Sequence, residues 1–246
     1  QRQTMHDLTS EEMLGLFADA PFAFEPGQRF NYSNQGYILL GMIIGKVTGV
    51  PYAEYVEREL LQPLGLAQTR YCDVRRIIPN RAEGYTYHEE ELVNAAYISM
   101  QNPGPAGGLC STVGDLIRWT HLLHSGQVVS LASLRQMTTP TALATGGTVG
   151  YGFGLWLDEL ADHPMIFHGG SISGFRASLV HYPEADLTVT VLMNAETGDD
   201  EKVAEALARA ADSQQPLVRA AALLHLALFG TLLYFSAQEL QKAIAY

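Results

Sequence analysis

A tyrosine and an asparagine lie two residues apart, just ahead of a helical pattern, in the segment Phe30-Asn31-Tyr32-Ser33-Asn34. A phenol has an ordinary pKa of about 10, so Tyr32 can serve as a base only if nearby cations lower that pKa. The Asn34 amide carries both donors and an acceptor, which suits it to hold a substrate amide or ester in place. Taken alone, the motif favours a simpler interpretation, in which Tyr32 is buried and Asn34 caps the helix.

A second group of chemically useful residues is His168-Gly169-Gly170-Ser171, at the end of a strand-like run. Two glycines let a substrate backbone approach closely, and the N–H group after them can face a developing oxyanion. His168 could orient a substrate carbonyl or carboxylate, or help to tune a base. By itself the motif favours a histidine before a tight turn. Ser171 lies outside the G-x-S-x-G pattern of a nucleophile elbow, so we do not expect it to attack a substrate.

The elements that must position these motifs change character along the chain. Capping residues and helical periodicity predict helices over residues 9–18, 35–48, 51–61, 111–126, 130–137 and 199–211. Runs rich in β-branched and aromatic residues predict strands over 151–157, 165–168, 175–182 and 187–193. Residues 67–108 are rich in turn signals and are expected to be irregular, with the acidic run 89–91 in a solvated loop. We expect an α+β fold in which helices pack on an antiparallel sheet.

Composition excludes some functions. The chain has 246 residues, enough to bury a sizeable core, and its net charge of −11 argues against a nucleic-acid partner. Of the eight histidines, His121 and His124 form an i, i+3 pair without a matching acidic or cysteine group, so we expect no metal. Cys72 and Cys110 are most simply two buried thiols, although a disulfide stays open because spacing alone does not give geometry.

The residues around both motifs match a longer ordered pattern between Pro21 and Ala211. The matching segments are Pro26-Gly27, Phe30-x-Tyr32-Ser33-Asn34-x-Gly36-Tyr37, Leu40-Gly41, Thr48-Gly49, Pro63-Leu64-Gly65-Leu66, Ala106–Thr112, Asp115-Leu116, Tyr151-Gly152-x-Gly154, His168-Gly169-Gly170, Gly174-Phe175 and Val191–Asn194. In this order they resemble the β-lactamase-related serine hydrolases. That group contains class C β-lactamases, D-alanyl-D-alanine carboxypeptidases and esterases.

The resemblance implies a β-lactamase/transpeptidase-like fold and hydrolysis of amide, lactam or ester substrates through an acyl-enzyme, without a cofactor. It assigns catalytic roles to Tyr32 and His168 and substrate-binding roles to Asn34, Gly169, Gly170 and Ser171, whose N–H would complete the oxyanion hole. A histidine in place of the lysine of many members shifts the expectation modestly from β-lactamase towards esterase or peptidase activity. The resemblance also suggests an extracytoplasmic or membrane-associated location.

The family's Ser-x-x-Lys motif, which carries the nucleophile, has no counterpart in these residues. The chain has three lysines, and the residues three places before them are Ile43, Asp199 and Glu239. We therefore expect this chain to be the C-terminal portion of such an enzyme, inactive alone, with a sheet edge left uncovered. The rival expectation is a non-catalytic protein of the same fold that binds peptidoglycan-like or acyl ligands.

The C-terminal residues require a separate interpretation. We expect residues 1–212 to form the hydrolase-like domain and residues 213–246 an apolar tail. The segment Ala220–Ala237 is almost wholly apolar and near the minimum length of a membrane span. A helix docked on the domain is favoured, where it could cover part of the exposed sheet, and a membrane helix is the alternative.

Overall fold

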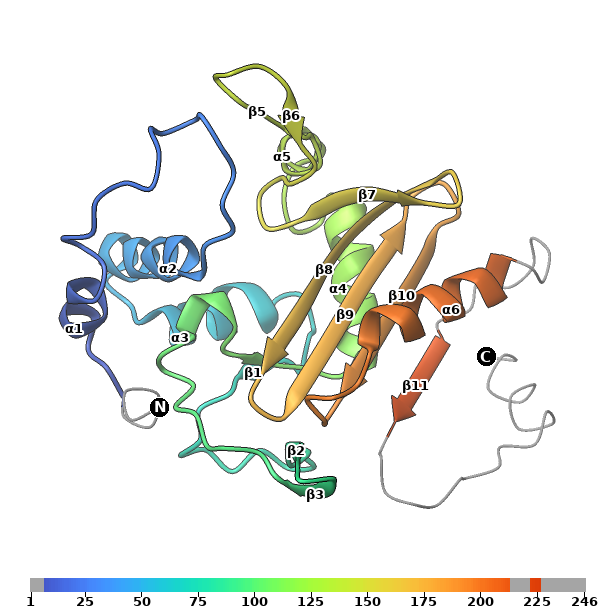
Figure 1. Ribbon diagram of the computed structural model, residues 1–246, viewed down its shortest axis with the longest axis horizontal. Helices are drawn as coiled ribbons and strands as arrows, with labels where there is room; N and C mark the ends of the chain where they lie inside the picture. The colour runs from blue at the N-terminus through green and yellow to red at the C-terminus, as the bar shows by residue number, and fades with distance from the viewer. Residues whose placement is uncertain (1–6, 213–221, 227–246) are drawn as a thin grey trace. The chain divides into compact units, whose positions relative to one another are not determined.

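The computed structural model describes residues 7–212 and 222–226, which divide into two compact units (Figure 1). The first, called here the helical unit, contains the described residues of Gln1–Ala82 and Ala95–Asp158. The second, called the sheet unit, contains those of Glu83–Asn94 and Glu159–Tyr246. Each unit is described by itself.

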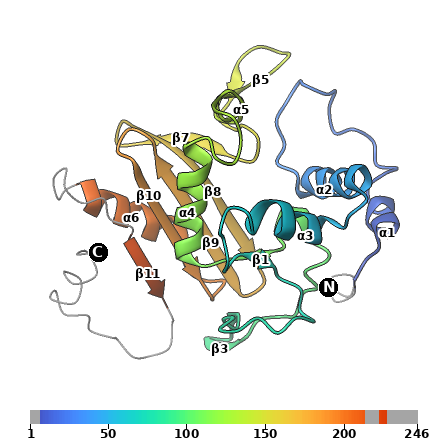
Figure 2. The same ribbon diagram turned by 180° about the vertical axis from the view of Figure 1, so that it is seen from behind.

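The helical unit contains most of the helices. They are α1 (Ser10–Gly15), α2 (Asn34–Thr48), α3 (Tyr52–Tyr55), the π-helical turn η2 (Val56–Leu61), the 3-10 turn η3 (Gly104–Ala106), α4 (Val113–His124) and α5 (Leu131–Met137). Two short antiparallel pairs join β1 (Arg70–Tyr71) to β4 (Leu109–Cys110) and β5 (Thr141–Ala142) to β6 (Thr148–Val149). Helices α2 and α3 lie side by side in both views (Figures 1 and 2). The predicted helices are confirmed, except that the one over residues 51–61 changes from α to π geometry partway along.

Local sequence signals explain the ends of these helices. The Thr9 hydroxyl accepts the N–H of Glu12, and the Glu12 carboxylate accepts the N–H of Thr9, which completes the expected capping box. Helix α2 ends at Gly49, which adopts a left-handed conformation with φ of 71°. A residue with a Cβ is strained in that conformation, so glycine is favoured there.

The helical unit has a core between η2, the segment after it and α4. Its buried members are Val56, Leu61, Leu66 and Leu122, with Trp119 packed at the edge. Three of these, Val56, Leu122 and Trp119, are residues that periodicity predicts on the inner faces of their helices. Complete burial of one such aliphatic side chain stabilises a fold by about 1.5–3 kcal/mol.

The two cysteines form a disulfide, so the favoured expectation of two free thiols is wrong. Cys72 and Cys110 have Cα atoms 5.2 Å apart, within the range that a disulfide can bridge. The antiparallel pairing of β1 with β4, in which Arg70 lies opposite Cys110, brings them together across 38 residues of sequence. Spacing alone could not reveal that pairing.

The sheet unit is built on an antiparallel meander. The strands are β7 (Trp156–Leu160), which begins in the helical unit, β8 (His163–Ile172), β9 (Phe175–Tyr182), β10 (Leu187–Met193) and β11 (Ala222–Leu226), in the spatial order β11-β10-β9-β8-β7. Strands β8 and β9 are antiparallel, as are β9 and β10. The predicted strands at 165–168, 175–182 and 187–193 are confirmed, and the helix predicted over 199–211 is α6 (Asp200–Asp212).

The strand predicted over 151–157 is wrong for its first part. Tyr151 forms an isolated bridge with Trp156, and the chain between them turns back on itself. The Gly152 N–H donates to the Leu155 carbonyl, and Gly154 has φ of 78°. Two glycines thus convert an apparently continuous aromatic run into a tight turn.

The expectation of irregular structure throughout residues 67–108 is also wrong. Strands β2 (Tyr85–His88) and β3 (Glu91–Asn94) form a hairpin within this stretch. Its turn consists of Glu89 and Glu90, both exposed and both with positive φ, and Glu91 begins β3. Periodicity fails here because the strands are short and partly exposed.

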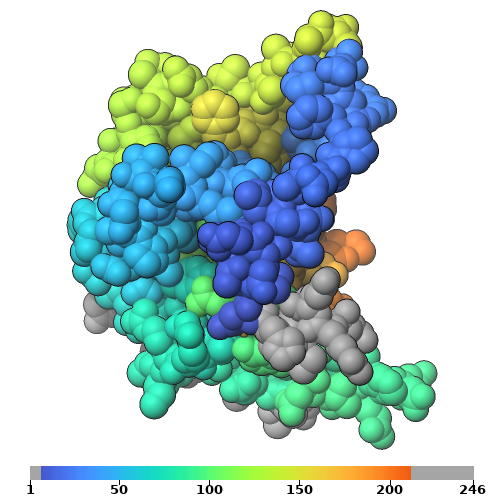
Figure 3. Space-filling view, turned by 90° about the vertical axis from the view of Figure 1, so that its left-hand side faces the viewer, coloured from blue at the N-terminus to red at the C-terminus, as the bar shows by residue number. Residues whose placement is uncertain are grey.

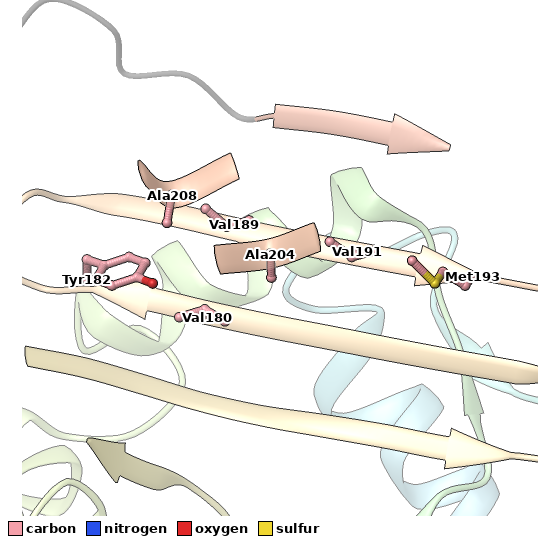
Figure 4. Close-up of a cluster of buried hydrophobic side chains, with 7 residues drawn as sticks. All are labelled: Val180, Tyr182, Val189, Val191, Met193, Ala204 and Ala208. Atoms are coloured by element: carbon pink, nitrogen blue, oxygen red, sulfur yellow. The ribbon is translucent and has the colours of Figure 1, made fainter. Parts of the chain in front are cut away.

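Helix α6 covers one face of the sheet through an apolar stripe. Ala204 and Ala208 of α6 pack onto the side chains shown in Figure 4. Those sheet residues are Val180 and Tyr182 of β9 and Val189, Val191 and Met193 of β10. The two-residue alternation along β10 directs these three side chains to the α6 face and those of the intervening Thr190 and Leu192 to the other.

The helix predicted over Ala220–Ala237 is wrong for Ala222–Leu226, which form β11, parallel to β10. A run that is almost wholly apolar has no periodicity to separate helix from strand, and the edge of β10 offers backbone groups for pairing. The rest of this segment lies outside the described residues. Within the described part of the chain, no single helix is long and apolar enough to cross a membrane, but Asn34–Thr48 and Tyr52–Leu61 pass that test as a pair bent by 78°.

A carboxylate holds the β8–β9 turn and the β2–β3 hairpin together inside the sheet unit. Glu196 accepts the N–H of Gly174 at 2.7 Å and the hydroxyl of Thr86 at 2.8 Å. Arg176 donates to the Glu196 carbonyl at 2.5 Å and forms an ion pair at 3.6 Å with the buried Asp200. Because β8 runs into this turn, the contacts fix the end of the strand that carries His168.

We expect the disulfide to contribute up to about 4 kcal/mol to the free energy of unfolding, because it closes a long loop. Urea unfolding of the chain should shift to lower concentration on reduction. The double variant Cys72→Ser/Cys110→Ser should unfold like the reduced protein and be insensitive to reductant. Two reactive thiols in the unfolded, unreduced chain would contradict the disulfide.

Glu196 should make the stability of the sheet unit pH-dependent. Hydrogen bonds from Gly174 and Thr86 hold the pKa of Glu196 below its ordinary value of 4.5. This stabilisation is therefore complete above the ordinary pKa and is lost as pH falls through the lowered one. Glu196→Gln should weaken the pH dependence of the unfolding free energy between about pH 5 and pH 3. Glu184→Gln, at an exposed carboxylate in the β9–β10 turn, is the control and should leave it unchanged.

Candidate active site

Tyr32 and Asn34 lie at the start of α2, where the chain enters the helix from an exposed segment (Figure 3, in blue). The cap of α2 is Ser33, whose hydroxyl accepts the N–H of Gly36 at 3.2 Å. Asn34 is the first helical residue and is exposed, and Tyr32 is 42% exposed. The simpler interpretation, a buried tyrosine with an asparagine cap, is therefore wrong on both counts.

Aromatic rings fix the segment that carries Tyr32. Tyr151 is buried, and the centre of its ring lies 5.2 Å from that of Phe30, 6.2 Å from that of Tyr32 and 4.6 Å from that of Trp156. The Tyr32 ring meets the Tyr151 ring at 89°, and Trp156 meets it at 76°. Edge-to-face packing at these separations is the favoured geometry of aromatic pairs, so Tyr151 acts as a common support.

A cavity of about 380 Å³ opens beside Tyr32. It is lined by Phe30, Asn31, Tyr32, Ser33, Gly36, Tyr37, Leu40 and Tyr151. All of these residues belong to the helical unit. The walls are mainly aromatic or aliphatic, with phenol hydroxyls and the Asn31 and Ser33 side chains as polar groups. Such a composition is typical of a small-molecule site.

Two phenols of this cavity, those of Tyr32 and Tyr151, are held in the neutral form by their surroundings. Burial, reinforced by the neighbouring Tyr37, raises the pKa of Tyr32 above its ordinary value. Burial likewise raises the pKa of Tyr151, and the hydrogen bond with Tyr37 adds to the effect. These surroundings are the opposite of those a tyrosine base needs, since a cation would have to favour the phenolate. With the described residues alone, Tyr32 is a hydrogen-bond donor.

His168 lies in the middle of β8, in the sheet unit. Its Nδ1 is 2.6 Å from the carbonyl oxygen of Gly169, so Nδ1 carries a proton and donates it. In the neutral ring Nε2 is then the acceptor. Across to β9, His168 pairs with Leu179, Gly170 with Ala177 and Ser171 with Arg176.

The two faces of β8 have different neighbours. Phe167 packs against the α6 core, and a Cβ at Gly169 would lie 3.8 Å from Oε1 of Glu201 on α6. By alternation, His168 and Gly170 occupy the opposite face. A Cβ at Gly170 would make an ordinary 3.9 Å contact with Ala177, so packing within the sheet does not require a glycine there. Gly170 and Ser171 are exposed.

The two motifs are thus each assembled within a unit. The structure brings Tyr32 and Asn34 together at α2, and it places His168, Gly169, Gly170 and Ser171 in a row on β8. Among the described residues, no group of three or more His, Cys, Asp and Glu side chains is placed to hold a metal ion.

Sequence reasoning missed the surroundings of both motifs. Tyr37 belongs to the helix predicted over residues 35–48 and Tyr151 to the strand predicted over 151–157, yet both line the cavity at Tyr32. Nothing in the local pattern signals that they meet, because 114 positions separate them in the chain. Glu196 carried no signal either, since its partners come from the turn at Gly174 and from Thr86.

Comparison with known proteins gives several relatives. Penicillin-binding protein 4* of Bacillus subtilis is 30% identical over 203 residues, covering 77% of this chain and 44% of the relative. The D-aminopeptidase of Gluconobacter oxydans is 27% identical over 171 residues, covering 70% and 32%. The crystal structure of a D-stereospecific amidohydrolase from Streptomyces superimposes with a TM-score of 0.72 and 28% identity, covering 83% of this chain and 62% of that one.

These similarities confirm the expected fold, a β-lactamase/transpeptidase-like α+β architecture. The chain spans less than half the length of the two curated relatives and about three-fifths of the amidohydrolase. The family model described as beta-lactamase matches residues 1–213. The chain, with its Tyr32-x-Asn34 and His168-Gly169-Gly170 motifs in the family's order, therefore belongs to the beta-lactamase family.

Proposed function

We propose that this chain is the substrate-binding portion of a serine hydrolase that cleaves amide bonds through an acyl-enzyme. The observation that carries the proposal is the start of α2. Ser33 takes the helix cap, which leaves Asn34 exposed, two residues from Tyr32. Tyr32 lines a cavity. An exposed amide beside a phenol suits the binding of a substrate amide, which both donates and accepts hydrogen bonds.

The roles follow from the chemistry of each group. Tyr32 transfers the proton between nucleophile and leaving group, and Asn34 holds the amide on the acyl side of the scissile bond. Gly170 leaves room for the substrate backbone, and the Ser171 N–H donates to the oxyanion. His168, with Nε2 as acceptor, orients a donor group of the substrate. Gly170 is exposed, and packing within the sheet would tolerate a Cβ at this position. This supports the proposal that a ligand, and not the fold, requires a glycine here.

The substrate class rests on the named relatives. Two of them are a D-aminopeptidase and a D-stereospecific amidohydrolase. We propose that the natural substrate is an amide of a D-amino acid or a peptide containing one, in preference to a lactam or ester. A neutral substrate amide also suits a chain with net charge −11 better than an anionic one.

The raised pKa of Tyr32 favours a second candidate for the chain by itself. A neutral phenol donates a hydrogen bond but cannot take a proton from a serine at neutral pH. With no Ser-x-x-Lys among its residues, the isolated chain would bind acyl or peptidoglycan-like ligands without turnover. Catalysis requires a nucleophile and a cation that lowers the pKa of Tyr32.

The isolated chain should form no acyl-enzyme, because none of its serines is part of a Ser-x-x-Lys motif. Incubation with benzylpenicillin or with an aryl phosphonate ester should leave its intact mass unchanged. A penicillin-binding protein treated in parallel should gain the mass of each reagent. A stable adduct on this chain would overturn the assignment of the nucleophile to another segment.

The proposed catalytic role of Tyr32 can be tested in a protein extended by the coding sequence upstream of Gln1. An in-frame Ser-x-x-Lys there should give a protein that hydrolyses D-amino acid amides. In it, Tyr32→Phe should lower kcat by about 10²–10⁴-fold, the usual contribution of general acid–base catalysis. Tyr87→Phe, at an exposed tyrosine of β2, should leave kcat unchanged. A nearby start codon without the motif would favour the binding function instead.

A further inference from the structure

The cavity beside Tyr32 has a shape that the proposed chemistry does not itself require. Proton transfer needs the Tyr32 hydroxyl, and amide binding needs Asn34, but neither explains about 380 Å³ of aromatic-walled space. An engineered apolar cavity of about 150 Å³ is enough to bind benzene in another protein. The cavity here therefore has room for a phenyl group and its linking atoms.

One wall of the cavity is preformed and held in place. Tyr151 is 7% exposed, and its ring contacts Phe30, Tyr32 and Trp156. Its backbone carbonyl accepts the Thr141 hydroxyl at 2.6 Å, and its side chain hydrogen-bonds to that of Tyr37. A wall fixed from several sides keeps its shape without a ligand, which lowers the entropy lost on binding.

The mouth of the cavity is open and apolar. Phe30 is 37% exposed, Tyr32 is 42% exposed and Leu40 is 51% exposed. Exposed aromatic and aliphatic edges around a hollow lose contact with water when a ligand enters, which favours apolar ligands. The edges and faces of Phe30 and Tyr151 also offer the offset and edge-to-face geometries that a ligand ring prefers.

We propose that this cavity is a subsite for an aromatic side chain on the acyl part of the substrate amide, and that Leu40 and Phe30 set its size. The inference deepens the proposed function. It rests on that function in one respect, namely that the molecule bound in the cavity is a substrate. It specifies the substrate class as amides whose acyl side carries a benzyl-like group, with that group beside Tyr32 and the amide towards Asn34.

The test is a binding titration on the chain as it is, with 4-fluorophenylacetamide as the probe and ¹⁹F NMR as the readout. The fluorine signal should broaden and shift on addition of the chain. Unlabelled phenylacetamide should displace the probe, whereas acetamide, which lacks the ring, should not. A fluorine signal unaffected by the chain, or displacement by acetamide as effective as by phenylacetamide, would overturn the subsite.

A matched pair of substitutions on α2 locates the binding. Leu40→Phe adds bulk at the mouth and should weaken binding at least about tenfold, a change of about 1.4 kcal/mol. Val47→Phe makes a comparable change on the same helix, at a residue that is 79% exposed and outside the lining, and should bind within about twofold of the unmodified chain. Both positions are exposed, so both variants should fold, as checked by circular dichroism. Equal binding by the two variants would place the probe elsewhere.

Trp156 provides a second readout that needs no substitution in the cavity. Its ring lies 5.6 Å from Phe30 and 4.6 Å from Tyr151, while the second tryptophan, Trp119, belongs to the core around Leu122. In a Trp119→Phe background, phenylacetamide should change the Trp156 emission along the same saturation curve as the fluorine signal. An emission that stays constant while the probe binds would contradict the location.

Failure of the subsite and failure of the hydrolase can be told apart. The titration involves no turnover, so its outcome does not depend on the nucleophile. An extended protein that cleaves alanine and phenylalanine amides with equal kcat/KM would remain a hydrolase but would lack the subsite. A chain that binds phenylacetamide at Leu40, from a gene without a nucleophile motif, would retain the subsite as part of a binding protein.

Discussion

The packing of the buried Tyr151 ring against the segment before α2 is the contact on which the candidate site depends. The rings of Phe30 and Tyr32 both pack against the Tyr151 ring, and so does the ring of Trp156, which follows the turn after Tyr151. Such a cluster restricts rotamers over several residues at once, so it holds a partly exposed tyrosine in one place. The turn at Gly152 and Gly154 is what returns the chain so that Trp156 can pack there.

The same packing determines the electrostatics of Tyr32. Removing part of its ring from water, close to Tyr37, raises the pKa of the phenol and keeps it protonated. The aromatic cluster thus positions the hydroxyl and at the same time opposes its use as a base. Any role of Tyr32 as a base therefore requires a cation close enough to lower its pKa again. The aromatic residues position the Tyr32 hydroxyl, and a separate charged group must activate it.

The sheet unit follows a different principle, because backbone pairing does most of the positioning. The register of β8 on β9 places His168 and Gly170 on the face opposite α6, and a slip of one residue would exchange the two faces. Glu196 and Arg176 secure the turn at the end of these strands, while the apolar stripe of α6 covers the other face. Hydrogen bonds from Gly174 and Thr86 lower the pKa of Glu196 and keep its carboxylate ionised into mildly acidic conditions. The contacts that Glu196 makes with the turn and the hairpin therefore depend on its charge.

The sequence by itself determined the helices, the meander strands, the two motifs and the family, because capping residues, periodicity and motif order are local or linear signals. It also placed Val56, Trp119 and Leu122 on inner faces correctly. The tertiary structure alone decided that Cys72 meets Cys110, that Ser33 rather than Asn34 caps α2, and that Tyr37 and Tyr151 surround Tyr32. It also turned the apolar run at Ala222–Leu226 into a strand. Each of these outcomes depends on which distant segment is brought alongside, and pairing across long loops leaves no trace in local residue patterns.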